Sequence, residues 1–226
     1  MVDAVIFDCD GVLVDSEALG LEESAQYLRS HGFTWSAADL VKKFTGLRDD
    51  RFASLLSEAY RDIHGASPPP DFFDGLVAER RSRKDELTEV AGAALALERL
   101  SAANVPFAVA SSSRTPYLES KLKRTGLWSL AVPHVYSADR VANGKPAPDI
   151  FLHAAQRIDA APGACLVVED SPNGVKAGVA AGMIVCGFIG GGHCYDGHDA
   201  LLLDAGANFI AADFSTLLER ALNVSV

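Results

Sequence analysis

The sequence feature that most constrains the fold is a short apolar segment near the N-terminus that ends abruptly in acidic residues. Residues 4–7 are all apolar, and Asp8, Asp10 and Gly11 follow directly. A continuous apolar run of this length is typical of a strand buried on both faces of a parallel sheet. Alternate residues of a strand point to the same side, so Asp8 and Asp10 are expected together at the strand end, where Gly11 lets the chain turn. The segment therefore predicts two carboxylates at one edge of a sheet.

Two neighbouring carboxylates repel each other unless a cation or a shared proton relieves the repulsion. Oxygen ligands of this kind favour Mg²⁺. A simpler alternative is that Asp8, Asp10 and Asp15 only cap a turn, and an Asp-x-Asp-Gly run also occurs in calcium loops. The motif alone leaves these alternatives open.

The segment that follows the first strand has the apolar spacing of helices. Leu21, Ala25 and Leu28 recur at helical intervals, and Gly32 is a stop signal. Further helices are predicted around 37–44, 49–63 and 71–87. Residues 16–84 are therefore predicted to form an inserted all-helical domain.

From residue 85 onward the pattern alternates between strands and helices, which is the signature of a parallel sheet wrapped by helices. The predicted strands are 106–110, 134–137, 164–168, 184–188 and 208–210. The predicted helices are 92–103, 116–125, 148–158, 172–181 and 214–222. The predicted fold class is α/β, with a Rossmann-like parallel sheet built from residues 1–15 and 85–226.

Polar residues follow several of the predicted strands, at the edge where open sheets of this kind bind ligands. Ser111 follows the second strand, Glu169 and Asp170 follow the fourth, and Lys145 lies in a loop before a helix. Clustered carboxylates, a hydroxyl and one ammonium suit phosphoryl transfer, which needs charge neutralisation and in-line positioning. A carboxylate nucleophile would form an aspartyl phosphate.

Four motifs, in this order, resemble the haloacid dehalogenase-like superfamily: Asp8-x-Asp10-Gly, a strand ending at Ser111, Gly-Lys145-Pro, and Glu169-Asp170-Ser-Pro-Asn173. Within the superfamily the chain looks most like the β-phosphoglucomutase-like phosphatases. The glycine-rich stretch at 187–198 is similar to phosphatases of the 6-phosphogluconate phosphatase type. The resemblance covers essentially the whole chain and implies that residues 16–84 are a helical cap domain.

The resemblance also implies a role for each matching residue. Asp8 would be the nucleophile that attacks phosphorus, and Asp10 would protonate the leaving oxygen and then activate water. Ser111 would hydrogen-bond the transferring phosphoryl group, and Lys145 would neutralise its charge. The implied Mg²⁺ ligands are Asp8, Asp10 through its backbone carbonyl, Glu169 and Asp170.

Three further residues are candidates for substrate binding. Ser112 follows the second strand, although for both Ser112 and Ser113 a role as polar residues leading into a helix is the favoured explanation. Asn173 would order the acidic loop, or simply tolerate a turn. Arg48 resembles a Gly-x-Arg cap loop that reaches the substrate in related enzymes, and its alternative is a solvated surface arginine.

An acid at position 10 indicates phosphate-ester chemistry, because related dehalogenases and ion pumps lack it. The predicted function is a Mg²⁺-dependent phosphatase that hydrolyses a small phosphorylated sugar or sugar acid. One alternative is β-phosphoglucomutase, whose cap histidine has no counterpart in residues 16–21. Another is a non-catalytic phosphoacceptor of the receiver type, in which the phosphorylated Asp would lie on a later strand.

Charge and composition restrict the partners. The net charge of −10 speaks against nucleic acid or an anionic membrane as a partner. Residues 16–84 are nearly neutral, with 10 basic and 11 acidic side chains. Without a leader-like segment or a long apolar span, the expectation is a cytoplasmic monomer.

The cysteines and histidines show no metal-ligand spacing in the sequence. Cys9, Cys165, Cys186 and Cys194 are scattered, and three of them lie in or beside apolar runs, as reduced core thiols do. His193 and His198 are too isolated to predict a metal site. The run of three glycines at 190–192 is predicted to be a surface loop.

Overall fold

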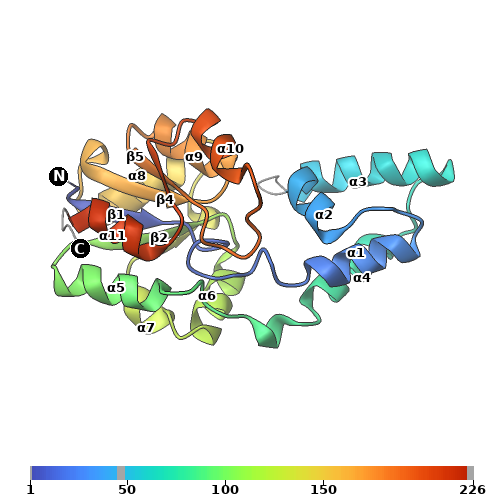
Figure 1. The fold of residues 1–226 in the computed structure, drawn as a ribbon, viewed down its shortest axis with the longest axis horizontal. Coiled ribbons are helices and arrows are strands. Elements are labelled where there is room, and N and C mark those ends of the chain that lie inside the picture. Colours follow the sequence, from blue (N-terminus) through green and yellow to red (C-terminus); the bar gives the residue numbers. More distant parts are fainter. Residues whose placement is uncertain (1, 45–48, 223–226) are drawn as a thin grey trace. The chain divides into compact units, whose positions relative to one another are not determined.

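The structure is a computed structural model that describes residues 2–44 and 49–222 (Figure 1). The chain divides into two compact units, each described here by itself. Unit 1 comprises Met1–Ser16 and Leu87–Val226, and unit 2 is Glu17–Glu86. Unit 1 is therefore formed from two separate parts of the sequence.

Unit 1 is built on a parallel sheet of six strands in the order β3-β2-β1-β4-β5-β6. The strands are β1 (Ala4–Phe7), β2 (Phe107–Ser111), β3 (Val135–Ser137), β4 (Cys165–Glu169), β5 (Ile184–Phe188) and β6 (Phe209–Ala211). The first strand of the chain thus lies inside the sheet, between β2 and β4. The α/β prediction is confirmed.

Side chains alternate along each strand, so each face of the sheet carries an apolar core of its own. In β1, Val5 and Phe7 belong to one apolar core, whereas Ala4 and Ile6 belong to the other. All four side chains are fully buried. This explains why the strand is apolar at every position instead of alternating.

Each face of the sheet has its own set of helices (Figure 1). The first core is closed by α5 (Ala93–Ala102), α6 (Thr115–Arg124), α7 (Trp128–Ala131) and α11 (Phe214–Leu222). The second is closed by α8 (Asp149–Arg157), α9 (Pro172–Ala180) and α10 (His198–Asp204). Two short 3₁₀ segments, η2 (Ala138–Arg140) and η3 (Pro162–Ala164), complete the connections.

Within the described residues of unit 2, all regular secondary structure is helical. It contains α1 (Leu21–Ser30), α2 (Ala37–Phe44), α3 (Asp49–His64), α4 (Phe72–Arg81) and the 3₁₀ segment η1 (Lys84–Glu86). Its core is rich in aromatic rings, and Phe72 packs edge-on against Tyr60 with ring centroids 5.0 Å apart. A hydrogen bond of 2.9 Å from Tyr27 Oη to the Phe72 carbonyl ties α1 to the start of α4.

Two helices of unit 1 were not predicted. The helix α7 has only four residues, which is too short to show periodicity, and α10 follows the glycine-rich loop that suggested irregular structure. In the described part of the chain, no helix combines the length and apolarity that crossing a membrane requires.

Candidate active site

The candidate site forms where three adjacent parallel strands end. Asp8 follows β1, Ser111 is the last residue of β2, and Glu169 is the last residue of β4. Phe7 pairs with Val168 across the sheet, so the next residues of β1 and β4 are neighbours. The strand order therefore brings together side chains that are far apart in the sequence.

Lys145 links two of these carboxylates. Its Nζ donates to Asp8 Oδ1 at 2.5 Å, to Glu169 Oε1 at 2.6 Å and to the Ala110 carbonyl at 3.0 Å. The ammonium and both carboxylates are buried. Burial lowers the pKa of Lys145, but Asp8 and Glu169 outweigh burial and raise that pKa above its usual value. Lys145 is therefore a fixed positive charge beside Asp8.

One ammonium does not neutralise this group of acids. Burial raises the pKa of Asp8 to about 7; Lys145 opposes the increase, and Glu169 and Asp10 add to it. Burial likewise raises the pKa of Glu169 against the effect of Lys145, with repulsion from Asp170 adding to the increase. The site has an excess of negative charge that an added cation would offset.

Asp10 has a different environment from Asp8. Its carboxylate accepts hydrogen bonds from Lys121 Nζ, from Ser16 Oγ, and from Ser113 Oγ at 2.7 Å. Burial raises the pKa of Asp10, but the Lys121 charge and these hydrogen bonds outweigh burial and lower that pKa below its usual value. In this structure Asp10 is therefore an anchored carboxylate.

The serines after β2 differ in what they contact. Ser111 is fully buried, and its Oγ lies 3.5 Å from Asp10 Oδ2. Ser113 contacts Asp10 directly, and its backbone N–H donates to Ser111 Oγ at 3.0 Å. Ser112 is exposed. The structure thus brings Ser113, which the sequence suggested only as a lead into a helix, to Asp10 and leaves Ser112 at the surface.

The loop after β4 holds the acidic pair in place. The backbone N–H and Oγ of Ser171 donate to Glu169 Oε2 at 3.1 and 3.0 Å, and Ser171 Oγ caps α9 by accepting from the Gly174 N–H. Asn173 is half-buried in the first turn of that helix. A Cβ on Gly174 would lie 1.8 Å from Glu169 Cδ, so a glycine is required beside this carboxylate.

Asp170 is held by two histidines that sequence reasoning did not include in the site. His193 Nε2 lies 2.9 Å from Asp170 Oδ2, and His198 Nε2 lies 2.6 Å from the Asp170 backbone carbonyl. Asp170 also packs against the turn after β1, where a Cβ on Gly11 would lie 1.9 Å from Asp170 Oδ2. Gly11 has φ of +78°, so both its conformation and its surroundings require glycine.

The glycine-rich loop that contains His193 is partly buried. The sequence predicted a surface loop at 190–192, but Gly191 and His193 are buried, and Gly192 N–H donates to Asp15 Oδ1 at 3.0 Å. The prediction failed because glycine content signals an irregular backbone without telling where it packs.

The missed residue Lys121 lies in a helix and not at a strand end, so the strand-end rule could not identify it.

The acidic residues fit a hard divalent cation. Asp8, Glu169 and Asp170 each place a carboxylate oxygen within 4.8 Å of the others, and all three residues are buried. All-oxygen donor sets suit Mg²⁺. The Asp10 carboxylate is not part of this group. These three residues are called the acidic cluster below.

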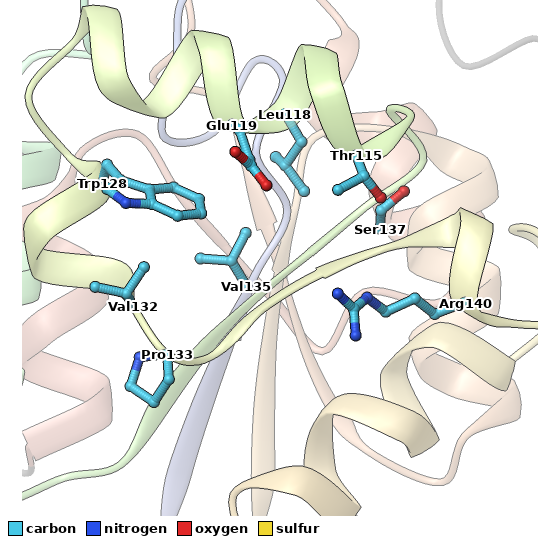
Figure 2. Close-up of a pocket in the computed structure, with 9 residues that line it drawn as sticks. All are labelled: Thr115, Leu118, Glu119, Trp128, Val132, Pro133, Val135, Ser137 and Arg140. Carbon is cyan, nitrogen blue, oxygen red and sulfur yellow. The ribbon is translucent and has the colours of Figure 1, made fainter.

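Arg48 falls outside the described residues. A hollow on unit 1 contains none of the candidate site residues: it is lined by side chains of α6, α7 and β3, among them Trp128 and Val135, together with Arg140 (Figure 2). We therefore place the candidate site at the acidic cluster and not in this hollow.

A comparison with protein families matches residues 2–182 to the haloacid dehalogenase-like hydrolases. The chain belongs to this family. Among curated members, hexitol phosphatase A from Escherichia coli (strain K12) is 35% identical over 78% of each protein. The 6-phosphogluconate phosphatase from the same strain is 26% identical over 88% of this chain and 85% of its own length. The expectation of a phosphatase-type member of the superfamily is confirmed.

Two other comparisons extend the family similarity. A bifunctional riboflavin kinase/FMN phosphatase from Arabidopsis thaliana is 32% identical over 79% of this chain, and the match spans 46% of that longer protein. The crystal structure of a haloacid dehalogenase family hydrolase from Deinococcus radiodurans, with bound phosphate and sodium, superimposes with a TM-score of 0.85. It is 36% identical, and the match covers 98% of this chain and 96% of that one.

Proposed function

We propose that the protein is a Mg²⁺-dependent phosphatase that hydrolyses a small phosphorylated sugar or sugar acid through an aspartyl phosphate on Asp8. The main supporting observation is the buried contact of Asp8 with Lys145, beside the acidic cluster. The named activities of hexitol phosphatase A and 6-phosphogluconate phosphatase support the substrate class. The cytoplasmic location and the monomeric state remain predictions from the sequence.

In the first step, an oxygen of the Asp8 carboxylate attacks phosphorus, and the bond from phosphorus to the ester oxygen breaks. Lys145 holds Asp8 Oδ1 at 2.5 Å and keeps a positive charge next to the site where phosphoryl charge accumulates. Ser111, at the end of the neighbouring strand, would donate its hydroxyl proton to a phosphoryl oxygen. These groups are positioned by strand ends, which limits the motion needed for attack.

Asp10 would exchange protons in both halves of the reaction. As an acid it would give a proton to the leaving alcohol, and as a base it would take a proton from the water that attacks the aspartyl phosphate. The anchored carboxylate seen here is prepared for the base step, because Lys121 and Ser113 stabilise its charged form. The acid step requires that the Lys121 contact weaken when substrate binds.

The bound Mg²⁺ would supply positive charge to the phosphoryl oxygens and to the acidic cluster. Asp8, Glu169 and Asp170 would hold it with their carboxylates, and Asp10 with its backbone carbonyl. His193 and His198 would keep Asp170 oriented toward it through the two contacts described above.

We further propose that unit 2 is the cap, and that Arg48 recognises an anionic group of the substrate other than the phosphate. Residues 16–84 are nearly neutral, whereas the rest of the chain is acidic, so an anionic substrate group would meet less repulsion from this segment. The Arg48 guanidinium can bind a carboxylate through two hydrogen bonds. Ser112 and Asn173 remain proposed substrate contacts. Hydrolysis is proposed over mutation because residues 16–21 contain no histidine.

The decisive experiment is a phosphate-release assay with Mg²⁺ over a panel of sugar phosphates, sugar-acid phosphates and nitrophenyl phosphate. The wild type should release phosphate repeatedly, and Asp8→Asn should lose activity by at least about 10³-fold because the nucleophile is absent. Acid quenching should trap a phosphoenzyme in the wild type only. Conversion of β-glucose 1-phosphate to glucose 6-phosphate faster than phosphate release would instead establish the mutase. A single phosphorylation without turnover would establish a phosphoacceptor.

A further inference from the structure

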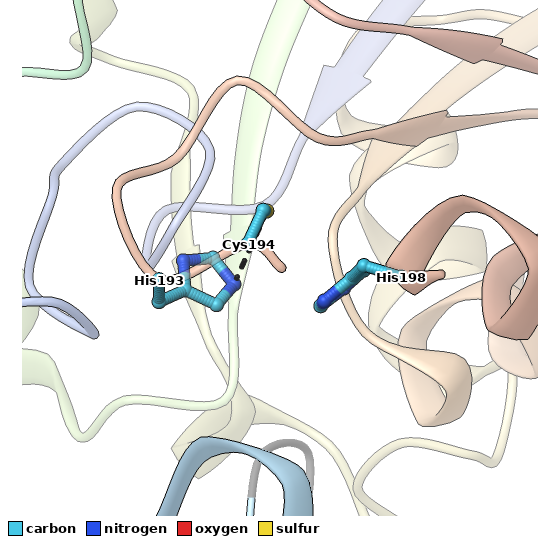
Figure 3. Close-up of side chains that lie close together, drawn as sticks. All are labelled: His193, Cys194 and His198. Carbon is cyan, nitrogen blue, oxygen red and sulfur yellow. Dashed lines mark hydrogen bonds between the residues drawn. The ribbon is translucent and has the colours of Figure 1, made fainter. Parts of the chain in front are cut away.

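A second group of metal-binding side chains lies in the loop between β5 and α10. His193, Cys194 and the first residue of α10, His198, lie close together (Figure 3). One ring nitrogen of each histidine and Cys194 Sγ are within 4.8 Å of one another. The histidines are only 3% and 2% exposed, whereas Cys194 is partly exposed and offers a route to solvent.

The spacing of these atoms is close to that of ligands on one zinc ion. His193 Nε2 and Cys194 Sγ are 3.8 Å apart. Zinc bonds of about 2.3 Å to sulfur and about 2.0 Å to nitrogen, at a tetrahedral angle, separate two such atoms by about 3.5 Å. A shift of a few tenths of an ångström would therefore bring this pair to bonding positions.

His198 has the hydrogen bonding of a metal-bound histidine. Its Nε2 faces the Asp170 carbonyl, which only accepts, so Nε2 must be the donor. In this tautomer of the neutral ring, the lone pair lies on Nδ1. That Nδ1 is buried and has no hydrogen-bond partner among the described residues. Metal-bound histidines commonly donate their other ring N–H to a carbonyl or carboxylate in this way.

His193 occupies a position that favours positive charge. Its Nε2 faces the Asp170 carboxylate at 2.9 Å and the Cys194 sulfur at 3.8 Å. A cation bound at this nitrogen would therefore lie beside a carboxylate and a sulfur, which both stabilise positive charge.

We propose that His193, Cys194 and His198 bind one zinc ion, at a site that adjoins the acidic cluster at Asp170 but has its own ligands. The thiolate and two imidazoles form a donor set that selects zinc over Mg²⁺. When the bonds to zinc form, Cys194 Sγ releases its proton to solvent, the proton on His193 Nε2 passes to solvent or to Nδ1 of the same ring, and no oxidation occurs. Zinc takes the Nε2 lone pair of His193, so the hydrogen bond from His193 to Asp170 is lost. If the proposed function holds, zinc therefore inhibits the enzyme without occupying the acidic cluster.

The test is zinc binding to zinc-free protein in saturating Mg²⁺, measured by calorimetry and by competition with a chromophoric chelator. The wild type should bind one zinc ion, and Cys194→Ser should weaken binding at least about tenfold, the smallest loss expected when a ligand is removed. Cobalt should give a thiolate charge-transfer band in the wild type and none in Cys194→Ser. The matched control is Cys165→Ser, which replaces a buried thiol of β4 and should bind zinc and cobalt as the wild type does.

Two results would overturn the proposal. In the first, Cys194→Ser leaves zinc binding unchanged and Asp8→Asn abolishes it. That result would place zinc in the acidic cluster. The other is the absence of zinc binding in folded wild type, which would mean that the histidines only hold Asp170. In the activity assay, zinc should inhibit the wild type far more than Cys194→Ser, whose zinc-free rate should equal that of the wild type. Binding does not depend on the proposed function, so its failure and that of the proposed function are distinguishable.

Discussion

Asp8 and Asp10 are two positions apart in the sequence, but their surroundings shift the two pKa values in opposite directions. Burial raises the pKa of Asp8 to about 7, and Glu169 and Asp10 add to the increase. In contrast, Lys121 and two serines lower the pKa of Asp10 against the effect of burial. The motif Asp-x-Asp-Gly predicted that both carboxylates would lie at the strand end. It could not predict their different surroundings, because those depend on Lys121 in α6 and on Ser113, which only the folded chain brings close.

The variant Asp10→Asn should slow turnover by about 10²–10⁴-fold, the usual cost of removing a general acid and base. The loss should be smaller for formation of the phosphoenzyme from nitrophenyl phosphate, whose leaving group needs little protonation. Pre-steady-state kinetics with nitrophenyl and alkyl phosphates measures this difference. Equal losses for the two classes of ester would rule out the acid role.

Neighbouring serines provide a matched pair of variants. Ser113→Ala removes the 2.7 Å hydrogen bond to Asp10 and should lower kcat about tenfold, in line with the loss of a hydrogen bond to a charged group. Ser112→Ala changes an exposed side chain and should change kcat by less than about twofold if this serine does not bind substrate. Steady-state assays of both variants measure the contrast. A larger effect at Ser112 would instead favour its predicted role as a substrate contact.

At the scale of elements, strand ends were the most predictable part of the molecule. Continuous apolar runs identified the strands of the sheet, and the rule that parallel strands place ligands at their carboxyl ends placed Asp8, Ser111 and Glu169 on one edge. The roles assigned to these residues remain predictions. The loop at 189–197 was less predictable, because its burial depends on contacts with Gly11, Asp15 and Asp170, which are distant in the sequence.

At Gly174, near the start of α9, helix propensity and side-chain packing predict opposite effects of an alanine on stability. Propensity alone predicts that Gly174→Ala stabilises the helix by about 1 kcal/mol. A Cβ there would lie 1.8 Å from Glu169 Cδ, so we expect destabilisation by about 1–3 kcal/mol instead. Urea unfolding measures the sign. Gly163→Ala is the control, since the nearest atom to its Cβ would be 4.0 Å away, and a stabilised Gly174→Ala would contradict the packing argument.

At the scale of the whole molecule, charge in the acidic cluster links metal binding to stability. Mg²⁺ at 100 times its dissociation constant should raise the free energy of unfolding by about 2.7 kcal/mol, because it binds the native state and relieves carboxylate repulsion. Asp170→Asn should lose most of this gain, because it removes one of the proposed Mg²⁺ ligands. Denaturant titrations with Mg²⁺ and with EDTA test both statements. An unchanged Mg²⁺ effect in Asp170→Asn would exclude Asp170 as a ligand.

The interrupted sequence of unit 1 has a consequence for synthesis on the ribosome. The strand β1 is translated before its neighbours β2 and β4. Val5 in β1 pairs with Phe107 and with Leu166, which are translated only after unit 2 is complete. Unit 2 has its own apolar core, so it can begin to fold before β2 and β4 have been translated. At that stage both edges of β1 are unpaired. A nascent chain at that stage contains the proposed nucleophile without Lys145 or Asp170. We expect such a chain to expose unpaired strand edges until β2 and β4 have been translated, and the proposed activity to require both strands.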